Sequence, residues 1–384
     1  MTVSTPQAGD ESKVPALPVP LPERNVPIVI GVTGHRDPVA ADVGELRRHF
    51  GEILARYRRE YPSTPLVVLS GLATGADSIA ADEAFAQAVP VIACLASPLE
   101  RFEKDFTDDE REALYDRLAR CARIDVVADD PKRESGFIAV KAYLNRYSNL
   151  VVAFWDGDAG PGGKPKAGGT ADVVADRLSG AHISDLAAMM APAAPDAGPV
   201  IQIVTAREGR ERPERTLQVV EIFPRSPIAK IDMRREFEGA LKRLDIYNAD
   251  IARQSGGSEL EPCLATLRRW TADCATRYQD TTNRYLRLFF AMGFGTAVLT
   301  VVAEPLMRIA AIAAAFFVYR LAAGRDHQNR YQDYQAFSEA LRVQLAWNSI
   351  GLTNESVDVA YATLRTVRFS RIRRRCRLET TRNV

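Results

Sequence analysis

"PLVVLSGLATGADSIAADEA" (residues 65–84) passes from an apolar run into a short turn and then into an alanine-rich helical pattern. The turn holds Ser70 and Gly71, and a second glycine follows at Gly75. A buried strand that ends in small, polar residues before a helix is typical of the parallel sheets of α/β proteins. This stretch therefore predicts a strand, turn and helix in succession, with the turn open to a ligand.

The same alternation continues on both sides of this unit. "IVIGVTGH" (28–35) precedes it, and "PVIACLA", "RIDVVAD", "LVVAFWD" and "PVIQIVTA" follow with helical patterns between them. Strands that alternate with helices call for a parallel sheet with helices on both faces. We expect a Rossmann-like α/β domain over residues 27–206, in which ligands bind beyond the carboxyl ends of the strands.

Composition excludes several classes of partner. The chain has 50 basic and 49 acidic residues, so no overall positive field favours nucleic acid, and no nucleic-acid partner is expected. The five cysteines and four histidines are scattered, which predicts neither a metal site nor disulfides. Residues 1–26 are rich in Pro, Ser and charge and lack the apolar segment of a signal peptide, so they predict a disordered leader.

The composition changes after residue 206. Residues 207–285 predict a helical connector, and two apolar runs follow, "LFFAMGFGTAVLTVVA" (288–303) and "IAAIAAAFFVYRLAA" (309–323). Each run is shorter than the roughly 20 residues that span a bilayer, but flanking residues extend both. Arginines lie outside the two outer ends, which favours cytoplasmic termini. We expect a two-pass transmembrane hairpin over residues 286–323 in the inner membrane; the alternative is a buried helical hairpin in a soluble core.

Residues 324–384 are expected to form cytosolic C-terminal helices and a basic tail. The tail, "VRFSRIRRRCRLETTRNV", would contact anionic lipid head groups if the hairpin lies in a membrane. The alternative for such a tail is a nucleic-acid contact.

Four segments bring small and polar residues to the ends of predicted strands. Glycine lets the backbone approach a phosphate closely, and free N–H groups at a helix N-terminus favour an anion. Hydroxyl groups donate to phosphate oxygens, arginines neutralise charge, and aspartates accept from ribose hydroxyls. The alternative is that these glycines serve only tight turns. We expect a nucleotide site formed by Gly31, Thr33, Gly34, His35, Arg36, Ser70, Gly71, Thr74, Gly75, Asp77, Arg146, Trp155, Asp156, Gly157, Gly168, Gly169, Thr170 and Asp172.

Four of these residues have a second interpretation. His35 is either a general base or a turn histidine bonded to backbone, and Trp155 either stacks on a base or packs under the sheet edge. Asp77 fits an N-cap for a helix that begins at Ser78 better than a ligand contact. Arg146, on a predicted helix just before a strand, is either a ligand contact or a solvated side chain.

These segments resemble the SLOG superfamily, which groups the DNA-processing protein A Rossmann domain with the LOG phosphoribohydrolases. "LSGLATGADSIAADEA" is close to the Ser-Gly-Leu-Ala-x-Gly-x-Asp signature of that family. "GVTGHRD" resembles its first-strand loop, and "NRYSNLVVAFWDG" with "GGTADVV" resembles a later strand and its glycine-threonine helix start. The resemblance covers residues 26–206 and implies that Ser70 to Asp77 form one wall of a nucleotide pocket.

One departure from the LOG motif concerns catalysis. LOG hydrolases carry a Pro-Gly-Gly-x-Gly-Thr-x-x-Glu motif whose glutamate serves catalysis, and counting from Thr170 that position is Val173. Asp172 is adjacent, but on a helix it points about 100° away. No catalytic residue is therefore assigned, and no cofactor is required beyond the nucleotide ligand.

The helical remainder is similar to membrane effectors of bacterial nucleotide-signalling and antiphage systems. Related SLOG domains bind ADP-ribose-type ligands in melastatin-type channels and Thoeris-type defence effectors. The resemblance implies a membrane-anchored sensor that binds an ADP-ribose-like or cyclic nucleotide second messenger. Binding would control membrane perturbation or pore formation by a homo-oligomer in contact with membrane lipids. The alternative is a membrane-tethered nucleotide N-glycosidase or nucleotide hydrolase.

Overall fold

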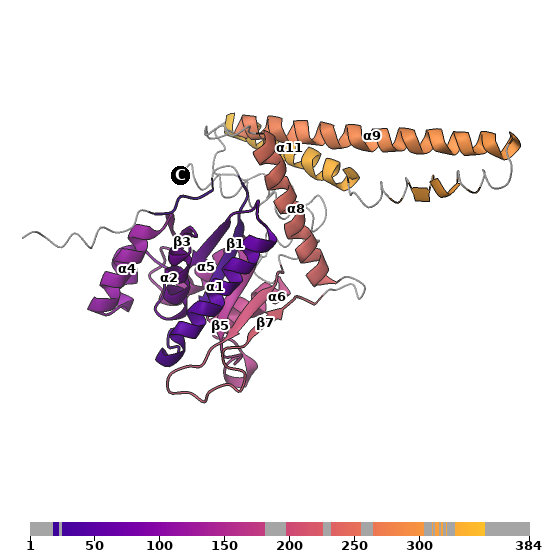
Figure 1. Ribbon diagram of the computed structural model, residues 1–384. Coiled ribbons are helices and arrows are strands. Elements are labelled where there is room, and N and C mark those ends of the chain that lie inside the picture. The colour runs from indigo at the N-terminus through magenta and orange to yellow at the C-terminus, as the bar shows by residue number, and fades with distance from the viewer. Residues whose placement is uncertain are drawn as a thin grey trace, which may run out of the picture. The chain divides into compact units, whose positions relative to one another are not determined.

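The computed structural model describes residues 18–22, 25–180, 197–225, 232–254, 264–302, 309, 312–314, 316, 317, 320 and 327–349. The chain divides into two compact units. The sheet unit comprises Met1–Met189 and Pro195–Asn248, and the helical unit comprises Met190–Ala194 and Ala249–Val384. Figure 1 labels the helices and strands of both units.

The sheet unit is built on seven strands in the order β4-β3-β2-β1-β5-β6-β7. All neighbouring strands are parallel except β6 and β7, which are antiparallel. The predicted Rossmann-like α/β fold with a mostly parallel sheet is therefore confirmed. The strands are β1 (Ile28–Gly34), β2 (Leu66–Ser70), β3 (Val91–Leu95), β4 (Arg123–Val126), β5 (Leu150–Trp155), β6 (Val200–Val204) and β7 (Val219–Ile222).

Helices cover both faces of this sheet, as Figure 1 shows. The long ones are α1, α2, α4, α5, α6 and α8, and short helical turns follow β1, β3 and β5. Their bounds are η2 (Ala40–Asp42), α1 (Val43–Glu60), α2 (Ala76–Ala86), α3 (Leu99–Phe102), η3 (Glu103–Asp105), α4 (Asp108–Arg120), α5 (Arg133–Tyr147), η4 (Pro161–Gly163), α6 (Thr170–Ser179) and α8 (Met233–Gln254).

The pleat of β1 divides the core into two layers. Ile28, Ile30 and Val32 pack with α1, α2 and α4 on one face, where Phe50 is fully buried. Val29 points to the opposite face and packs in a cluster with Leu144 of α5. Successive strand residues face opposite sides, so a strand that is apolar at every position must have both faces covered.

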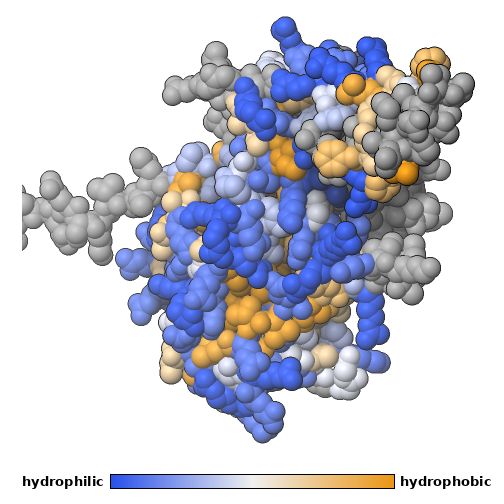
Figure 2. All heavy atoms as spheres, turned by 45° about the vertical axis from the view of Figure 1, so that its right-hand side comes forward, coloured by the Kyte–Doolittle hydropathy of each residue, from blue (hydrophilic) through white to orange (hydrophobic). Residues whose placement is uncertain are grey.

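Arg177 is one of the few charged residues of the described chain that are buried. Figure 2 shows a largely hydrophilic face on which apolar residues gather in a band across the lower half. Arg177 of α6 is only 1% exposed. Its guanidinium donates to the carbonyl oxygens of Asn145 (2.8 Å) and Asn149 (2.6 Å) and thereby ties α6 to the end of α5 and the start of β5.

The sheet unit extends beyond both predicted boundaries. The expected helical connector (207–285) contains β7, an edge strand of the sheet, and the first part of α8 belongs to the same unit. At the other end, the expected leader (1–26) contributes Leu21 and Val26 to packed clusters. Asn248 of α8 accepts from Val26 N and donates to Val26 O, both at 2.9 Å. These contacts join segments too far apart in sequence for a local pattern to reveal.

The helical unit contains α9 (Leu264–Val302) and α11 (His327–Ser349), which pack along each other, and the last residues of α8. Asp250 of α8 is 4% exposed and accepts hydrogen bonds from Tyr278 (2.6 Å) and Tyr334 (2.7 Å). The two tyrosine rings stack with centroids 5.5 Å apart. One buried carboxylate thus connects three helices of this unit.

The predicted hairpin over 286–323 begins within α9. Among the residues that the structure describes, no helix is both long and apolar enough to cross a membrane. Residues 303–308, most of 310–326 and all of 350–384 lie outside the described residues, and with them the turn of the hairpin and the basic tail.

Truncating the α1 core is expected to destabilise the sheet unit. Leu54 is fully buried between α1 and the sheet, so Leu54→Ala should lower the free energy of unfolding by about 2–5 kcal/mol. The exposed Arg59 on the same helix is the control, and Arg59→Ala should change it by less than about 0.5 kcal/mol. Urea unfolding followed by circular dichroism measures both; equal effects would contradict the assignment of the core.

Candidate functional site

The strand order places a topological switch point between β1 and β5. From β1 the chain adds β2, β3 and β4 to one side, and it then returns to add β5, β6 and β7 on the other. Loops that leave β1 and β5 therefore turn in opposite directions and leave a crevice between them. In open α/β sheets, ligands bind at this point, beyond the carboxyl ends of the strands.

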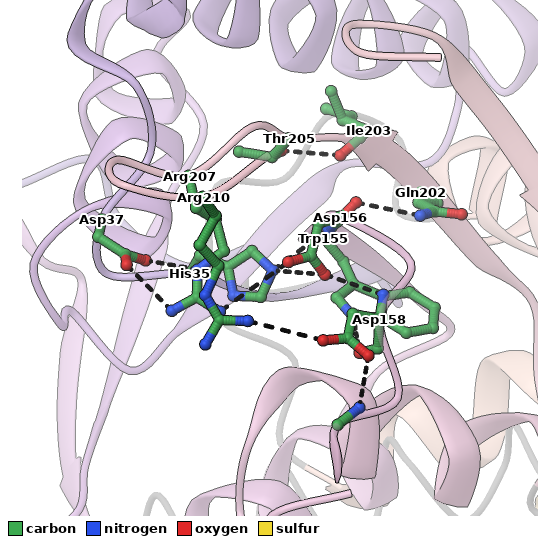
Figure 3. A network of polar contacts seen from close by, with 11 residues as sticks. His35, Asp37, Trp155, Asp156, Asp158, Gln202, Ile203, Thr205, Arg207 and Arg210 are labelled. Carbon is green, nitrogen blue, oxygen red and sulfur yellow. Dashed lines mark hydrogen bonds and ion pairs between the residues drawn. The ribbon is translucent and has the colours of Figure 1, made fainter. Parts of the chain in front are cut away.

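His35 and Asp156 join the loops that leave β1 and β5 (Figure 3). His35 Nε2 lies 3.2 Å from the backbone nitrogen and 3.1 Å from Oδ1 of Asp156. Burial lowers the pKa of His35, and the neighbouring Asp156 carboxylate opposes this shift. When Nε2 of the neutral imidazole is unprotonated, it accepts a hydrogen bond from the Asp156 N–H. This contact is the one expected of a turn histidine bonded to backbone.

Arg207, in the loop after β6, adds a third strand end to this group. It donates to both carboxylate oxygens of Asp37, at 2.9 and 3.0 Å, and its Nη1 lies 3.9 Å from Asp156 Oδ2. Hydrogen bonds from Arg207 lower the pKa of Asp37 against the opposing effect of burial. Sequence reasoning missed Arg207 because the expected domain ended at residue 206, although the residue follows a predicted strand directly.

Trp155 and Gly157 shape the β5 loop. Trp155 Nε1 donates to the carbonyl oxygen of Asp158 at 2.9 Å. The half-buried Trp155 ring packs at the edge of the apolar cluster that Val173 and Val174 of α6 form with β5 and β6. Gly157 has a φ of +92°, a conformation that favours glycine. Asp156 Oδ1 accepts from Asp158 N at 2.9 Å, so the loop is ordered by its own side chain.

The turn after β2 is held by Ser70. The Ser70 hydroxyl is fully buried; it accepts from Leu72 N (3.1 Å) and donates to Asp77 O (3.2 Å). Leu72 takes a φ of +50°, a conformation that non-glycine residues adopt uncommonly. Ser70 therefore shapes the wall of the crevice, while Thr74 is half-exposed on it.

Gly75 and Gly34 permit the closest backbone approach in the site. Gly75 has a φ of +83°, and a Cβ there would lie 2.6 Å from the carbonyl oxygens of His35 and Arg36. A Cβ on Gly34 would lie 2.4 Å from that of Ala76. Ala76 N donates to His35 O at 3.0 Å. The start of α2 is thus fastened beneath the β1 loop, which joins two of the predicted segments.

The prediction that Asp77 caps a helix beginning at Ser78 is wrong. Helix α2 begins at Ala76 with Gly75 as N-cap, and no side chain caps it. Asp77 Oδ1 is inaccessible to solvent and has no hydrogen-bond partner. Burial raises the pKa of this carboxyl to about 7, against the opposing Ala73 backbone hydrogen bond and the Arg36 charge. Asp77 is therefore a carboxyl that gains or loses its proton near neutral pH.

The turn before α6 is preformed. Gly168 has a φ of +69°, and a Cβ there would lie 2.7 Å from Phe137 Cβ of α5. Asp172 Oδ2 accepts from Gly168 N at 2.8 Å and lies 2.9 Å from Lys141 Nζ. Gly169 is the N-cap and Thr170 the first residue of α6. The side chain of Asp172 is thus engaged within the protein.

Val173, which stands where the LOG motif has its glutamate, is buried. It is 2% exposed and packs with Val151 and Val174 against the sheet. A side chain at this position faces the core, and no carboxylate enters the crevice from it.

Of the predicted site residues, Gly31 and Thr33 lie within β1, and Arg146 lies at the far end of the sheet. Gly31 is inside β1, where a Cβ would lie 2.2 Å from Ser148 Oγ, so it serves close packing. Arg146 is exposed on the last turn of α5, just before β5 begins. This places Arg146 at the amino ends of the strands, opposite the crevice, because α5 runs antiparallel to the sheet strands and ends there. Thr33 lies in β1 and is 8% exposed.

The first turns of α5 border the crevice, which the sequence pattern did not indicate. Phe137 contacts the Gly168 turn, and Val140 lies 3.7 Å from a Cβ built on Gly71. The Arg36 guanidinium lies 5.2 Å from the centre of the Phe137 ring. Three of the four predicted segments therefore border α5. Within the described residues, no group of three or more His, Cys, Asp or Glu side chains is arranged to hold a metal ion.

Replacing Asp77 is expected to change the pH dependence of stability. Its pKa of about 7 lies above the ordinary 3.8, so the folded protein holds a proton that the unfolded chain releases as pH rises between these values. This group therefore makes the free energy of unfolding fall from about pH 4 to pH 7, and Asp77→Asn should remove that contribution. Urea unfolding at several pH values measures it, with the exposed Asp109→Asn as control; an unchanged slope in Asp77→Asn would contradict the prediction.

Comparison with known proteins does not place this chain in a family. No protein-family model matches it, and no curated protein matches its sequence. The resemblance to the SLOG superfamily thus rests on the quoted motifs.

Proposed function

We propose that the sheet unit binds a nucleotide at the carboxyl ends of β1, β2 and β5. The observation that carries this proposal is the convergence of three glycine-bearing turns at the switch point. Gly34 ends β1, and Gly75 of the turn after β2 lies under the His35–Arg36 backbone of the β1 loop. Gly71 of that second turn and the Gly168 turn before α6 both border α5. These glycines stand where neighbouring atoms leave little room for a Cβ, and turns that lack side chains let a phosphate ester approach the backbone closely.

Anionic and polar groups of a nucleotide each have a partner in this crevice. The start of α6 presents N–H groups and a positive dipole end to a phosphate. Arg36 supplies positive charge beside it. Asp156 is 11% exposed and supplies a carboxylate of the kind that accepts from ribose hydroxyls, and the half-buried Trp155 ring lies next to it.

We propose a binding role in preference to hydrolysis. Val173 is buried, and Asp172 is engaged by Gly168 and Lys141. The alternative, a nucleotide hydrolase, is favoured by one observation, the contact of a neutral His35 with Asp156. In the tautomer whose Nε2–H donates to Asp156 Oδ1 instead of accepting from the Asp156 N–H, Nδ1 carries the lone pair of a general base. Recovery of each ligand after binding distinguishes the two roles.

Calorimetry of the full chain tests the binding site. At least one of ADP-ribose, its cyclic isomers, NAD, AMP and cyclic oligonucleotides should bind and be recovered intact. Arg36→Ala should weaken that binding roughly 10- to 100-fold, the usual contribution of a charge-assisted hydrogen bond.

Arg146→Ala is the matched control, because Arg146 is an exposed arginine at the opposite edge of the sheet. Gly75 is a poor test position, since any side chain there would collide with two carbonyl oxygens and break the turn. Absence of binding to the whole panel would refute the proposal, and released base or ribose phosphate would establish the hydrolase.

We further propose that the helical unit attaches the sensor to a membrane. The second half of α9 exposes large apolar side chains, with Phe290 at 70% and Phe294 at 74% exposed. Others on this half are Leu286, Leu288, Phe289 and Val298, and Ile309, Ile312, Phe316 and Phe317 follow in the predicted second run. Exposed apolar patches of this kind mark lipid or protein contacts.

The proposed effector acts as a homo-oligomer. A two-helix hairpin cannot enclose a pore by itself, so perturbation of a membrane requires several copies. A nucleotide would control this assembly only if its affinity differs between the two arrangements of the chain. A role in antiphage defence is the setting that the resemblance suggests.

Charges on the apolar half of α9 are expected to abolish membrane attachment. The full chain should co-float with vesicles of phosphatidylglycerol and phosphatidylethanolamine, and Phe290→Asp/Phe294→Asp should remain in the soluble or aggregated fraction. Thr276→Asp/Gln279→Asp, at exposed positions on the first half of α9, is the charge-matched control and should still float. Equal flotation of both double variants would contradict attachment through this half of α9.

A further inference from the structure

A group of charged side chains around Phe137 lies beside the proposed nucleotide site. Arg36 follows β1, Asp105 ends the short helix η3 after β3, and Arg133 is the first residue of α5. All three belong to connections that leave the carboxyl ends of strands. Only Arg36 carries a role in the site described above.

One carboxylate oxygen serves both arginines. Asp105 Oδ2 accepts from Arg133 Nε (3.1 Å) and Nη2 (2.8 Å), and Arg36 Nη2 lies 3.8 Å from the same oxygen. Each guanidinium has five N–H donors, so most of the donors of this pair are not used by Asp105. The pair is therefore better matched to an anion with several oxygens.

Phe137 holds the two guanidinium groups close to each other. Their central carbons lie 5.2 Å (Arg36) and 5.4 Å (Arg133) from the centre of its ring, within the range of cation–π attraction. The backbone of Phe137 also packs against Gly168, so the arginine pair adjoins the turn that opens α6. The anion-binding features of the site thus lie side by side.

Two other acidic residues interact electrostatically with Arg36, but neither of them replaces Asp105 as its ion-pair partner. The Glu110 carboxylate accepts from the backbone N–H and the hydroxyl of Thr107, at 2.8 and 2.9 Å. These hydrogen bonds lower the pKa of Glu110, and the Arg36 charge adds a smaller effect in the same direction. Burial raises the pKa of Asp77 and favours its neutral form, and the Arg36 charge opposes this shift. Asp105 is the carboxylate that contacts both arginines.

Asp105 is held by contacts that exchange easily. The side chains of Arg133 and Arg36 are 63% and 39% exposed, and that of Asp105 is 23% exposed. Ion pairs this accessible to water stabilise a protein little. A phosphate group also forms bidentate contacts with arginines, and it has more oxygens than a carboxylate to engage two guanidinium groups at once.

We propose that Arg36 and Arg133, stacked on Phe137, form a diphosphate subsite and that Asp105 is a built-in competitor for its anion. This inference rests on the proposed nucleotide site and specifies its ligand class. A diphosphate displaces Asp105 and offers each arginine its own phosphate group, whereas the single phosphate of a nucleoside monophosphate, nearly a dianion at neutral pH, has to be shared by both. The subsite therefore selects dinucleotide-type and diphosphate ligands over nucleoside monophosphates.

Calorimetry of the full chain with inorganic pyrophosphate and with ADP-ribose tests this subsite. Asp105→Asn removes the competitor and should tighten pyrophosphate binding up to about fivefold, the scale of an exposed ion pair. Arg133→Ala should weaken binding of both probes about tenfold. Asp129→Asn is the control, because Asp129 is an exposed aspartate in the connection from β4 to α5 that pairs with Arg101, and its replacement removes the same charge.

Pyrophosphate binding that is unchanged or weaker in Asp105→Asn would overturn the role of Asp105 as a competitor. Binding that Asp129→Asn tightens as much as Asp105→Asn does would also overturn that role. Unchanged binding in Arg133→Ala, with thermal unfolding like that of the parent, would overturn the diphosphate subsite. In both cases the parent protein still binds ADP-ribose, and the proposed nucleotide site stands. If neither the parent protein nor the variants bind pyrophosphate or ADP-ribose, the diphosphate subsite is overturned. If the parent protein also binds no other ligand of the nucleotide panel, the proposed function is overturned.

Discussion

The burial of β1 on both faces and both edges is the constraint on which the sheet unit depends. Its side chains alternate between two core layers, and its backbone pairs with β2 on one side and β5 on the other. Such a strand has no surface for chemistry along its length. All functional groups must then lie in the loops at its ends, and the reversal of strand order beside β1 leaves room at only the carboxyl end.

The same crowding explains why so many site residues support the fold. Neighbouring backbone or side-chain atoms leave no room for a Cβ at Gly34, Gly75 and Gly168. The Ser70 hydroxyl forms its hydrogen bonds within its own turn. These residues form walls of the crevice and position its edges. The groups left to meet a ligand are the exposed Arg36 and Arg133, with the mostly buried Asp156 below them in the β5 loop.

Sequence pattern predicted the strands better than the site. Apolar runs such as "IVIGV" and "LVVAF" became buried strands because continuous β-branched and apolar residues suit a sheet with two covered faces. Helix starts were harder to predict, and α2 begins at Ala76, two residues before the expected Ser78. Asp77 therefore lost its expected capping role to Gly75, and Arg146 came to lie at the wrong end of the sheet because the direction of α5 decides which edge its last turn reaches.

The sequence by itself determined the alternation of strands and helices, the parallel sheet and the edge at which glycine-bearing turns gather, because local periodicity and chain direction decide these features. Tertiary structure decided which distant segments meet. The contacts of Arg207 with Asp37, of Phe137 with Gly168 and of Asn248 with Val26 join residues 170, 31 and 222 positions apart. No local pattern specifies such pairs, since they depend on strand order and helix packing, and those are settled only when the whole core is buried.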